Sequence, residues 1–221
     1  MRETCRWWSD PATWSGYPFP IPEFIYFDMD DTLTRTTDWF VEQTRLYLVK
    51  NKMGDLLVEF EHIHDSGGTR FDYPEELKKV NSLLVRNCEY MNQVKPTPLF
   101  NYFFLIPGNQ PTGSKFGIVT QRGDNKKAEK FTSNWFKQFE MAATLSSIHC
   151  IHPKKTPSKI DYLMTIHPDG NFILVDDNPL YDVSVVHPHH RQLRIHTQHA
   201  TYGKAYSNQR TVEYCNGLYI L

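Results

Sequence analysis

Two carboxylates, Asp28 and Asp30, stand one residue apart directly after an apolar run at residues 24–27. An apolar run of this length, followed by turn-forming residues, is typical of a strand buried on both faces of a sheet. Carboxylates this close repel each other, so a folded chain keeps them together only if a cation neutralises their charge. A hard divalent metal ion with oxygen ligands is the expected cation.

Other apolar runs along the chain also end in polar side chains. The runs at residues 116–119, 148–151 and 172–175 each read as a buried strand. The residues that follow them are Thr120, Gln121 and Arg122 after the first, Lys154, Lys155 and Lys159 after the second, and Asp176 and Asp177 after the third. In a parallel sheet these strand ends share one edge, where open α/β sheets bind their ligands.

The alternation of strands and helical segments predicts an α/β fold with a Rossmann-like parallel sheet, covered by helices on both faces. A fifth strand is expected near residues 192–197. The helical block at residues 36–95 is too long for a single crossover helix, which indicates a small helical cap inserted after the first strand. We expect a core at residues 24–35 and 96–221 and a Trp- and Pro-rich N-terminal extension at residues 1–23.

This edge has the groups needed to hydrolyse a phosphate monoester. Asp28 would attack phosphorus and form an aspartyl-phosphate, provided that Mg²⁺ offsets the negative charge of both partners. Asp30 would protonate the leaving oxygen and then take a proton from the hydrolytic water. Thr120 would hold a phosphoryl oxygen, and a lysine would stabilise the charge on the transferring group.

The stretch Asp28-Met29-Asp30-Asp31-Thr32-Leu33-Thr34 resembles the DxDxT signature of the haloacid dehalogenase superfamily, specifically its phosphatases. Val119-Thr120 is similar to the second motif of that family, and residues 172–177 are similar to its fourth. The resemblance covers residues 24–182. It implies a Mg²⁺-dependent phosphatase, because an aspartate at position 30 is what the phosphatases have and the dehalogenases lack.

The resemblance implies a role for each matching residue. Asp28 is the nucleophile and a metal ligand, and Asp30 is the acid/base that also lends its backbone carbonyl to the metal. Asp177 corresponds to the metal-binding acid, with Asp176 its neighbour and an alternative ligand. Asp182 resembles a supporting acid. Lys159, at the start of a helix before the fourth strand, best fits the catalytic lysine, and Lys154 and Lys155 stay open as alternatives.

The helical block resembles a cap of the C1 type, which implies a small soluble phosphate ester such as a nucleotide or sugar phosphate. Gln121, Arg122 and Lys155 are expected to contact this substrate together with Thr120. Trp39 or Phe40 could stack on a base or ring, although packing within the cap is the preferred interpretation. The alternatives are a phosphatase for phosphoproteins or nucleic-acid ends, and a non-catalytic scaffold, against which Asp28, Asp30, Thr120 and Asp177 argue.

The overall composition fits a soluble cytoplasmic protein. The formal net charge of the 221 residues is −1, so neither nucleic acid nor an anionic membrane is the expected partner. No apolar stretch is long enough to span a bilayer, and no secretory leader is expected. The four cysteines lie far apart without a CxxC pair, which indicates free thiols. The histidines at 187, 189 and 190 read as polar loop residues, and the oligomeric state is not predicted.

Overall fold

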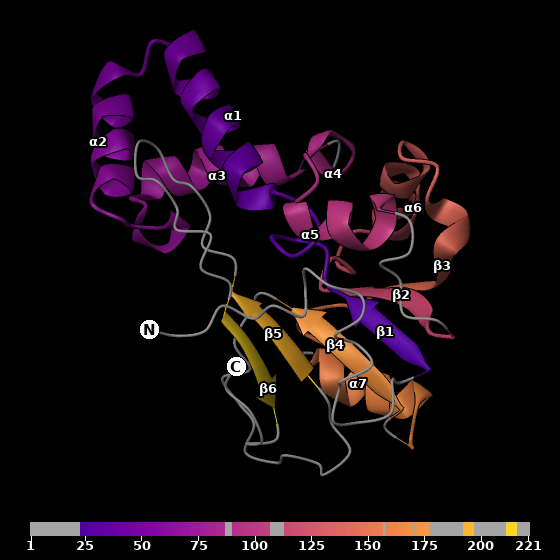
Figure 1. Cartoon of the computed structure of the whole chain (residues 1–221). Coiled ribbons are helices and arrows are strands. Elements are labelled where there is room, and N and C mark those ends of the chain that lie inside the picture. The colour runs from indigo at the N-terminus through magenta and orange to yellow at the C-terminus, as the bar shows by residue number, and fades with distance from the viewer. Residues whose placement is uncertain are drawn as a thin grey trace, which may run out of the picture.

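The computed structural model describes residues 23–86, 90–106, 113–156, 158–169 and 171–176, together with two strands at 192–196 and 211–215. Six strands form one sheet in the order β3-β2-β1-β4-β5-β6, so the first strand of the chain lies inside the sheet (Figure 1). Their bounds are β1 Phe24–Phe27, β2 Lys115–Thr120, β3 Leu145–Cys150, β4 Phe172–Asp176, β5 Gln192–His196 and β6 Thr211–Cys215.

Strands β1 to β5 run parallel, and β6 pairs with β5 in the antiparallel direction. The parallel α/β sheet predicted from the sequence is therefore confirmed, including a strand near residue 192. The strand β6 was not predicted. The chain builds β2 and β3 on one side of β1 and β4 on the other, which places a topological switch point between β1 and β4.

The alternation of side chains in β1 divides the core into two layers. Ile25 and Phe27 pack on one face of the sheet, and Tyr26 packs on the other. Gly117 in β2 lies beside Tyr26, where a Cβ atom would come within 2.3 Å of the tyrosine ring. A glycine is therefore needed for the ring of Tyr26 to lie flat against β2.

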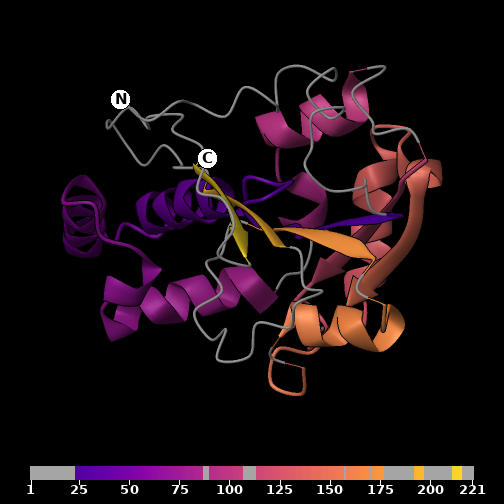
Figure 2. The same cartoon turned by 60° about the horizontal axis from the view of Figure 1, so that its bottom comes forward.

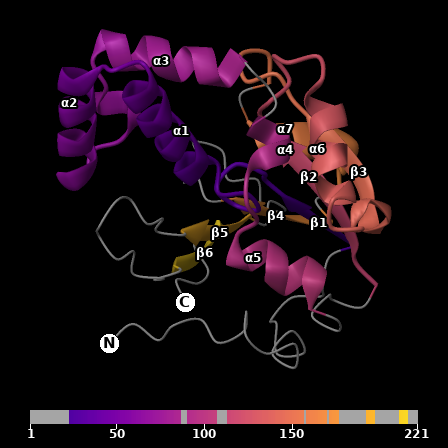
Figure 3. The ribbon, with the colours of Figure 1, turned by 90° about the horizontal axis from the view of Figure 1, so that it is seen from above.

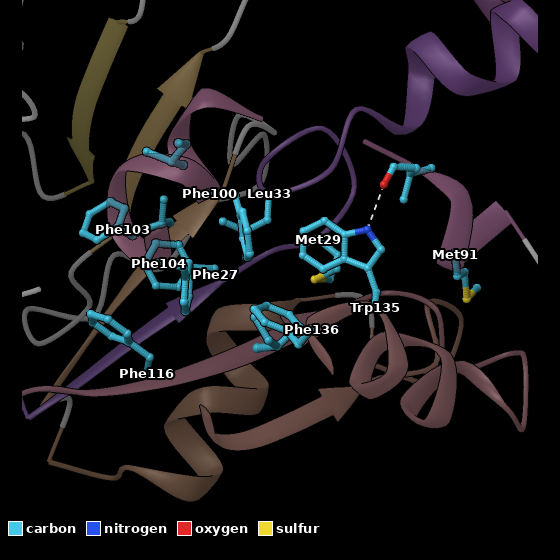
Figure 4. Close-up of a cluster of buried hydrophobic side chains, with 14 of the residues drawn as sticks. Phe27, Met29, Leu33, Met91, Phe100, Phe103, Phe104, Phe116, Trp135 and Phe136 are labelled. Atoms are coloured by element: carbon cyan, nitrogen blue, oxygen red, sulfur yellow. Dashed lines mark hydrogen bonds between the residues drawn. The ribbon is translucent and has the colours of Figure 1, made fainter. Parts of the chain in front are cut away.

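One face of the sheet is covered by α5 (Pro98–Phe100), the π-helix η4 (Asn101–Leu105) and α6 (Ala128–Lys137). Their aromatic side chains pack on β1 and β2, as Figure 4 shows for Phe103, Phe104 and Phe136. The indole nitrogen of Trp135 donates a hydrogen bond of 2.8 Å to the carbonyl of Val94 (Figure 4). A buried tryptophan N–H needs such a partner, and here it ties α6 to the chain that returns to the core.

The opposite face of the sheet is covered by α7 (Lys159–Ile166). Ile160 and Leu163 of this helix pack against Tyr26, Phe172 and Leu174. Ser158 caps the helix, because its hydroxyl accepts the N–H of Asp161 at 3.1 Å. Helices thus cover both faces of the sheet, as the sequence predicts. The first residue of α7, Lys159, lies at the edge of the sheet.

The helical insertion, residues 36–95, contains α1 (Thr36–Lys50), α2 (Gly54–Asp65), the 3₁₀ helix η3 (Arg70–Asp72), α3 (Glu75–Arg86) and α4 (Tyr90–Gln93). Helices α1, α2 and α3 form a group beside the sheet, seen in Figures 1, 2 and 3. They enclose an apolar core of their own, formed by Val41, Leu48, Phe60, Tyr73, Leu77 and Val80. Arg45 of α1 and Glu61 of α2 also pair through two hydrogen bonds of 2.5 and 2.6 Å.

The two chain segments that join the insertion to the core are bonded to each other. The N–H of Arg35 donates to the carbonyl of Lys95 at 2.8 Å, and the N–H of Thr97 donates to the carbonyl of Leu33 at 2.9 Å. The Thr97 hydroxyl adds a bond of 2.7 Å to the carbonyl of Thr32. The chain therefore enters and leaves the insertion through two neighbouring segments that are hydrogen-bonded to each other, shortly after Asp30. Its service as a cap stays a prediction.

Among the described helices, none combines the length and the apolar character required to cross a bilayer. The predicted N-terminal extension lies outside the described residues up to position 22, as do Asp177, Asp182 and the late histidines at 187, 189 and 190.

Candidate active site

The register of the sheet brings three polar residues to one edge. Phe27, the last residue of β1, pairs with Ile118 of β2 and with Val175 of β4. The N–H of Asp28 continues the ladder by donating to the carbonyl of Val175 at 2.9 Å. The strand ends at Asp28, Thr120 and Asp176 are therefore neighbours, as the pattern of apolar runs predicts.

Lys159 joins the acids from β1 and β4. Its ammonium nitrogen lies 3.0 Å from Asp28 Oδ1 and donates a hydrogen bond of 2.8 Å to Asp176 Oδ2. All three side chains are buried, and Lys159 is 8 % exposed. Burial on its own would lower the pKa of Lys159, but the two carboxylates outweigh it and raise the pKa above its usual value. The lysine is therefore a fixed positive charge between two acids.

Burial has the opposite effect on the acid that would attack phosphorus. It raises the pKa of Asp28 to about 7, against the attraction of Lys159 and with additional repulsion from Asp176 and Asp30. A carboxylate with so high a pKa needs further positive charge in order to stay ionised at neutral pH. The described surroundings of Asp28 therefore supply less positive charge than its ionised form needs at neutral pH.

The charges of the cluster agree with this shortage. Three carboxylates (Asp28, Asp30 and Asp176) share two cations (Lys159 and Arg122). A divalent metal fits such a set, since carboxylate oxygens are the ligands that Mg²⁺ prefers. In the described part of the chain no three His, Cys, Asp or Glu side chains gather as a ready metal site. Asp177, the other expected ligand, lies outside the described residues.

Thr120 has a hydroxyl that nothing in the described structure satisfies. Its side-chain oxygen is fully buried and makes no hydrogen bond with any described residue. A buried hydroxyl without a partner costs free energy, on the order of 1–3 kcal/mol. The group is therefore suited to donate to an oxygen of a ligand at the ends of β1 and β2.

Asp30 is held by Arg122, a contact that the sequence did not predict. Arg122 Nε donates to Asp30 Oδ2 at 2.7 Å, and Arg122 Nη2 donates to Asp30 Oδ1. The Thr36 hydroxyl donates to the same Oδ1 at 2.6 Å. Burial would raise the pKa of Asp30, but its pairing with Arg122 outweighs burial and lowers it.

The next residue, Asp31, organises the start of the helical insertion. Its backbone has a φ of 60°, in the left-handed region that aspartate tolerates better than most residues. Its carboxylate accepts the N–H of Thr37 at 2.8 Å and the hydroxyl of Thr37 at 2.5 Å. The acidic cluster therefore divides into Asp28 and Asp30 at the site and Asp31 at the entry to α1.

The other residues predicted to contact the substrate are either exposed in loops or packed against other side chains. Lys154, Lys155 and Gln121 are exposed side chains in the loops that follow β3 and β2. Trp39 and Phe40 are partly buried and pack on Tyr90, with ring centroids 5.7 and 4.9 Å from it. The two aromatic side chains thus join α1 to α4, in line with the cap-packing interpretation.

Comparison with proteins of known sequence gives no match to any family model, and no curated protein matches the chain. Solved structures do resemble it. A proposed phosphatase from Clostridium difficile has a TM-score of 0.47 and 18 % identity, over 72 % of this chain and 78 % of that one. A haloacid dehalogenase-like hydrolase from Streptococcus pneumoniae has a TM-score of 0.43 and 15 % identity, over 70 % and 75 % of the two chains.

A predicted phosphatase from Clostridium acetobutylicum has a TM-score of 0.44 and 17 % identity, over 71 % of this chain and 76 % of that one. All three similarities have TM-scores below 0.5.

Proposed function

We propose that this chain is a Mg²⁺-dependent phosphatase of the haloacid dehalogenase type, which hydrolyses phosphate monoesters through a phosphorylated Asp28. The observation that carries the proposal is the position of Lys159, whose ammonium lies 3.0 Å from Asp28 and 2.8 Å from Asp176. This arrangement unites a nucleophile, a fixed cation and a second acid at the switch point of an open sheet, where ligands bind. Thr120 lies at the end of the neighbouring strand, and its hydroxyl bonds to no residue in the described part of the chain.

Mg²⁺ would be held by Asp28, the backbone carbonyl of Asp30 and an acid at the end of β4, Asp176 or Asp177. When bound, it would offset the charge of the phosphate and orient it for in-line attack. The excess of one carboxylate in the described cluster supports this ion, because a phosphate ester would add further negative charge.

In the first half of the reaction, a carboxylate oxygen of Asp28 forms a bond to phosphorus. The bond from phosphorus to the leaving oxygen breaks, and its electron pair stays on that oxygen, which receives a proton from Asp30. This step uses the protonated form of Asp30, whereas its pairing with Arg122 favours the carboxylate that takes up a proton in the second half. In the second half, water attacks phosphorus and gives a proton to Asp30, which releases phosphate and restores Asp28. Thr120 donates its hydroxyl to a phosphoryl oxygen, and Lys159 balances the charge that builds up.

A small soluble ester, such as a nucleotide or sugar phosphate, is the substrate class that we favour. The helical insertion begins at Thr36, which is bonded to Asp30, so its helices start directly beside the proposed acid/base. Gln121, Arg122 and Lys155 are the further proposed contacts. A nucleic-acid end or a phosphoprotein is the alternative substrate, and it would need an insertion that leaves the site open.

The four cysteines are the basis for proposing a cytoplasmic location, since their wide spacing suits a reducing compartment. Cys150 is a free thiol in the structure.

Hydrolysis of an aryl phosphate by the purified protein with Mg²⁺ tests the proposal. The Asp28→Asn variant should lose turnover and keep the far-UV circular dichroism of the wild type. A panel of phosphorylated metabolites, a phosphopeptide and a 3′- or 5′-phosphorylated oligonucleotide would then identify the substrate class. If the wild type turns over none of these, the chain is a non-catalytic protein with this fold; if Asp28→Asn retains full activity, Asp28 is not the nucleophile.

A further inference from the structure

Arg122 and Asp30 form a bidentate ion pair, which requires the planar guanidinium group of an arginine. Two N–H groups from the same edge of the guanidinium reach the two oxygens of one carboxylate, with Nε at 2.7 Å from Oδ2 and Nη2 bonded to Oδ1. Such a bidentate pair fixes the plane of the carboxylate as well as its position. A lysine in the same place could supply the charge but not the plane.

The guanidinium is buried and contacts the ring of Tyr90, and its Nη1 makes no hydrogen bond with any described residue. The Arg122 side chain is 2 % exposed, whereas that of Asp30 is 34 % exposed, so the arginine lies beneath the acid. Its guanidinium carbon lies 5.7 Å from the ring centroid of Tyr90, in a cation–π contact. The next residue, Gly123, donates its N–H to the carbonyl of Ile151 at 2.9 Å, which ties the loop to the end of β3.

Arg122 and Thr36 donate to both carboxylate oxygens of Asp30, and 34 % of the side chain nevertheless stays exposed. A substrate can reach this exposed part. A carboxylate that exchanges protons with both a leaving oxygen and a water has to keep one orientation through both steps. The fork of Arg122 supplies that orientation.

We propose that Arg122 is a positioning residue, which orients the Asp30 carboxylate for both proton transfers and acts on the substrate through Asp30. This inference rests on the proposed function. It departs from the expectation drawn from the sequence, in which Arg122 contacts the substrate directly. The two roles predict different effects of an Arg122 substitution on kcat, depending on whether Asp30 is present.

A double-mutant cycle separates these roles. If Arg122 acts through Asp30, then Arg122→Lys should lower kcat for an alkyl phosphate about 10- to 100-fold in the wild-type background, a part of the about 10²- to 10⁴-fold that general acid–base catalysis supplies. The same substitution should change kcat by less than about 3-fold in an Asp30→Asn background, because coupled residues are not additive. Equal losses in both backgrounds would overturn the inference and make Arg122 a direct substrate ligand.

The leaving group gives a second readout that a merely structural role would not move. The leaving group of a dinitrophenyl phosphate is dinitrophenolate, which departs without needing a proton. Formation of the phosphorylated enzyme from this ester in a single turnover should therefore be little affected by Arg122→Lys. The same step with an alkyl phosphate should slow by the full factor. Equal slowing with both esters would contradict the inference.

The controls keep these outcomes separate. Arg45→Lys breaks an arginine–carboxylate fork of the same kind within the helical insertion, and it should leave both substrates unaffected. If Arg122→Lys does not fold by circular dichroism, Tyr90→Leu weakens the support of the guanidinium and should give the same selective loss for the alkyl ester. No turnover of either ester by the wild type would overturn the proposed function and this inference together, whereas equal losses in the variants overturn the inference alone.

Discussion

Lys159 Nζ lies 3.0 Å from Asp28 Oδ1, although one residue opens α7 and the other follows β1. The contact forms because Ser158 caps α7 and thereby sets the first residue of the helix against the strand ends. Lys154 and Lys155 belong to the same connection and are exposed. The geometry therefore favours Lys159 as the lysine that serves Asp28.

Replacing Lys159 by methionine should lower turnover of an aryl phosphate about 10²- to 10³-fold, since the charge that offsets the transferring group is lost. The variant should also lose about 3 kcal/mol of stability without Mg²⁺, because two buried carboxylates lose their cation. Steady-state kinetics and urea unfolding measure the two effects. Lys137→Met, at the exposed end of α6, is the matched control and should change neither. An active, stable Lys159→Met would remove Lys159 from the mechanism.

Removal of the metal should stop turnover, and Mg²⁺ should restore it, because the described acids outnumber the described cations at the site. Binding should also be visible without catalysis, as a Mg²⁺-dependent rise in the thermal unfolding midpoint. Asp28→Asn should reduce that rise, and so should the double variant Asp176→Asn, Asp177→Asn, which removes both acids that could serve at the end of β4. Full activity in a chelator, or a rise that both variants retain, would show that these carboxylates hold no metal.

Gly123→Ala should damage the loop that presents Arg122. A Cβ atom at this position would lie 2.3 Å from the carbonyl oxygen of Cys150, which is backbone and cannot step aside. We expect a loss of about 1–3 kcal/mol in unfolding free energy, together with reduced activity. Gly54→Ala is the control, since no atom lies within 4 Å of its Cβ position, and it should be tolerated. Unchanged stability of Gly123→Ala would contradict the close packing of the two loops.

His149 and His167 should each make the fold less stable as the pH falls below neutrality, whereas Asp28, whose pKa is raised to about 7, acts in the opposite direction over the same range. Burial lowers the pKa values of His149 and His167 in the folded state, and their rings bond to the hydroxyls of Tyr162 and Tyr26 at 3.0 and 2.8 Å. The unfolded chain therefore takes up protons first, near the ordinary histidine pKa of about 6.5, and stability is lost as the pH falls through that value toward the folded pKa values.

Urea unfolding midpoints at pH 7.5 and 5.5 would measure this loss. On going from pH 7.5 to 5.5, the double variant His149→Gln, His167→Gln should lose less stability than the wild type does, or gain more. An equal difference in both proteins would mean that other groups cause the pH dependence.

Local chemistry along the chain was enough to predict the sheet and the residues at its edge. Buried parallel strands need continuous apolar runs, and the side chains that follow such runs must meet at one edge. The apolar runs predict that Asp28, Thr120 and Asp176 lie together, with a lysine nearby. They do not predict β6, whose stretch of sequence has no clear pattern, and they do not distinguish Lys159 from Lys154 and Lys155.

Tertiary structure alone decided how the charges at that edge are paired. The bond between Arg122 and Asp30 joins residues 92 positions apart, and nothing in their spacing distinguishes it from a contact with substrate. The partner of a charged side chain depends on which loops pack together and which groups are buried, here the loop that Gly123 holds against β3. Buried strands can therefore be recognised from the sequence, because burial acts on each strand separately. Ion pairs depend on distances between segments that are far apart in the sequence, and only the folded chain sets those distances.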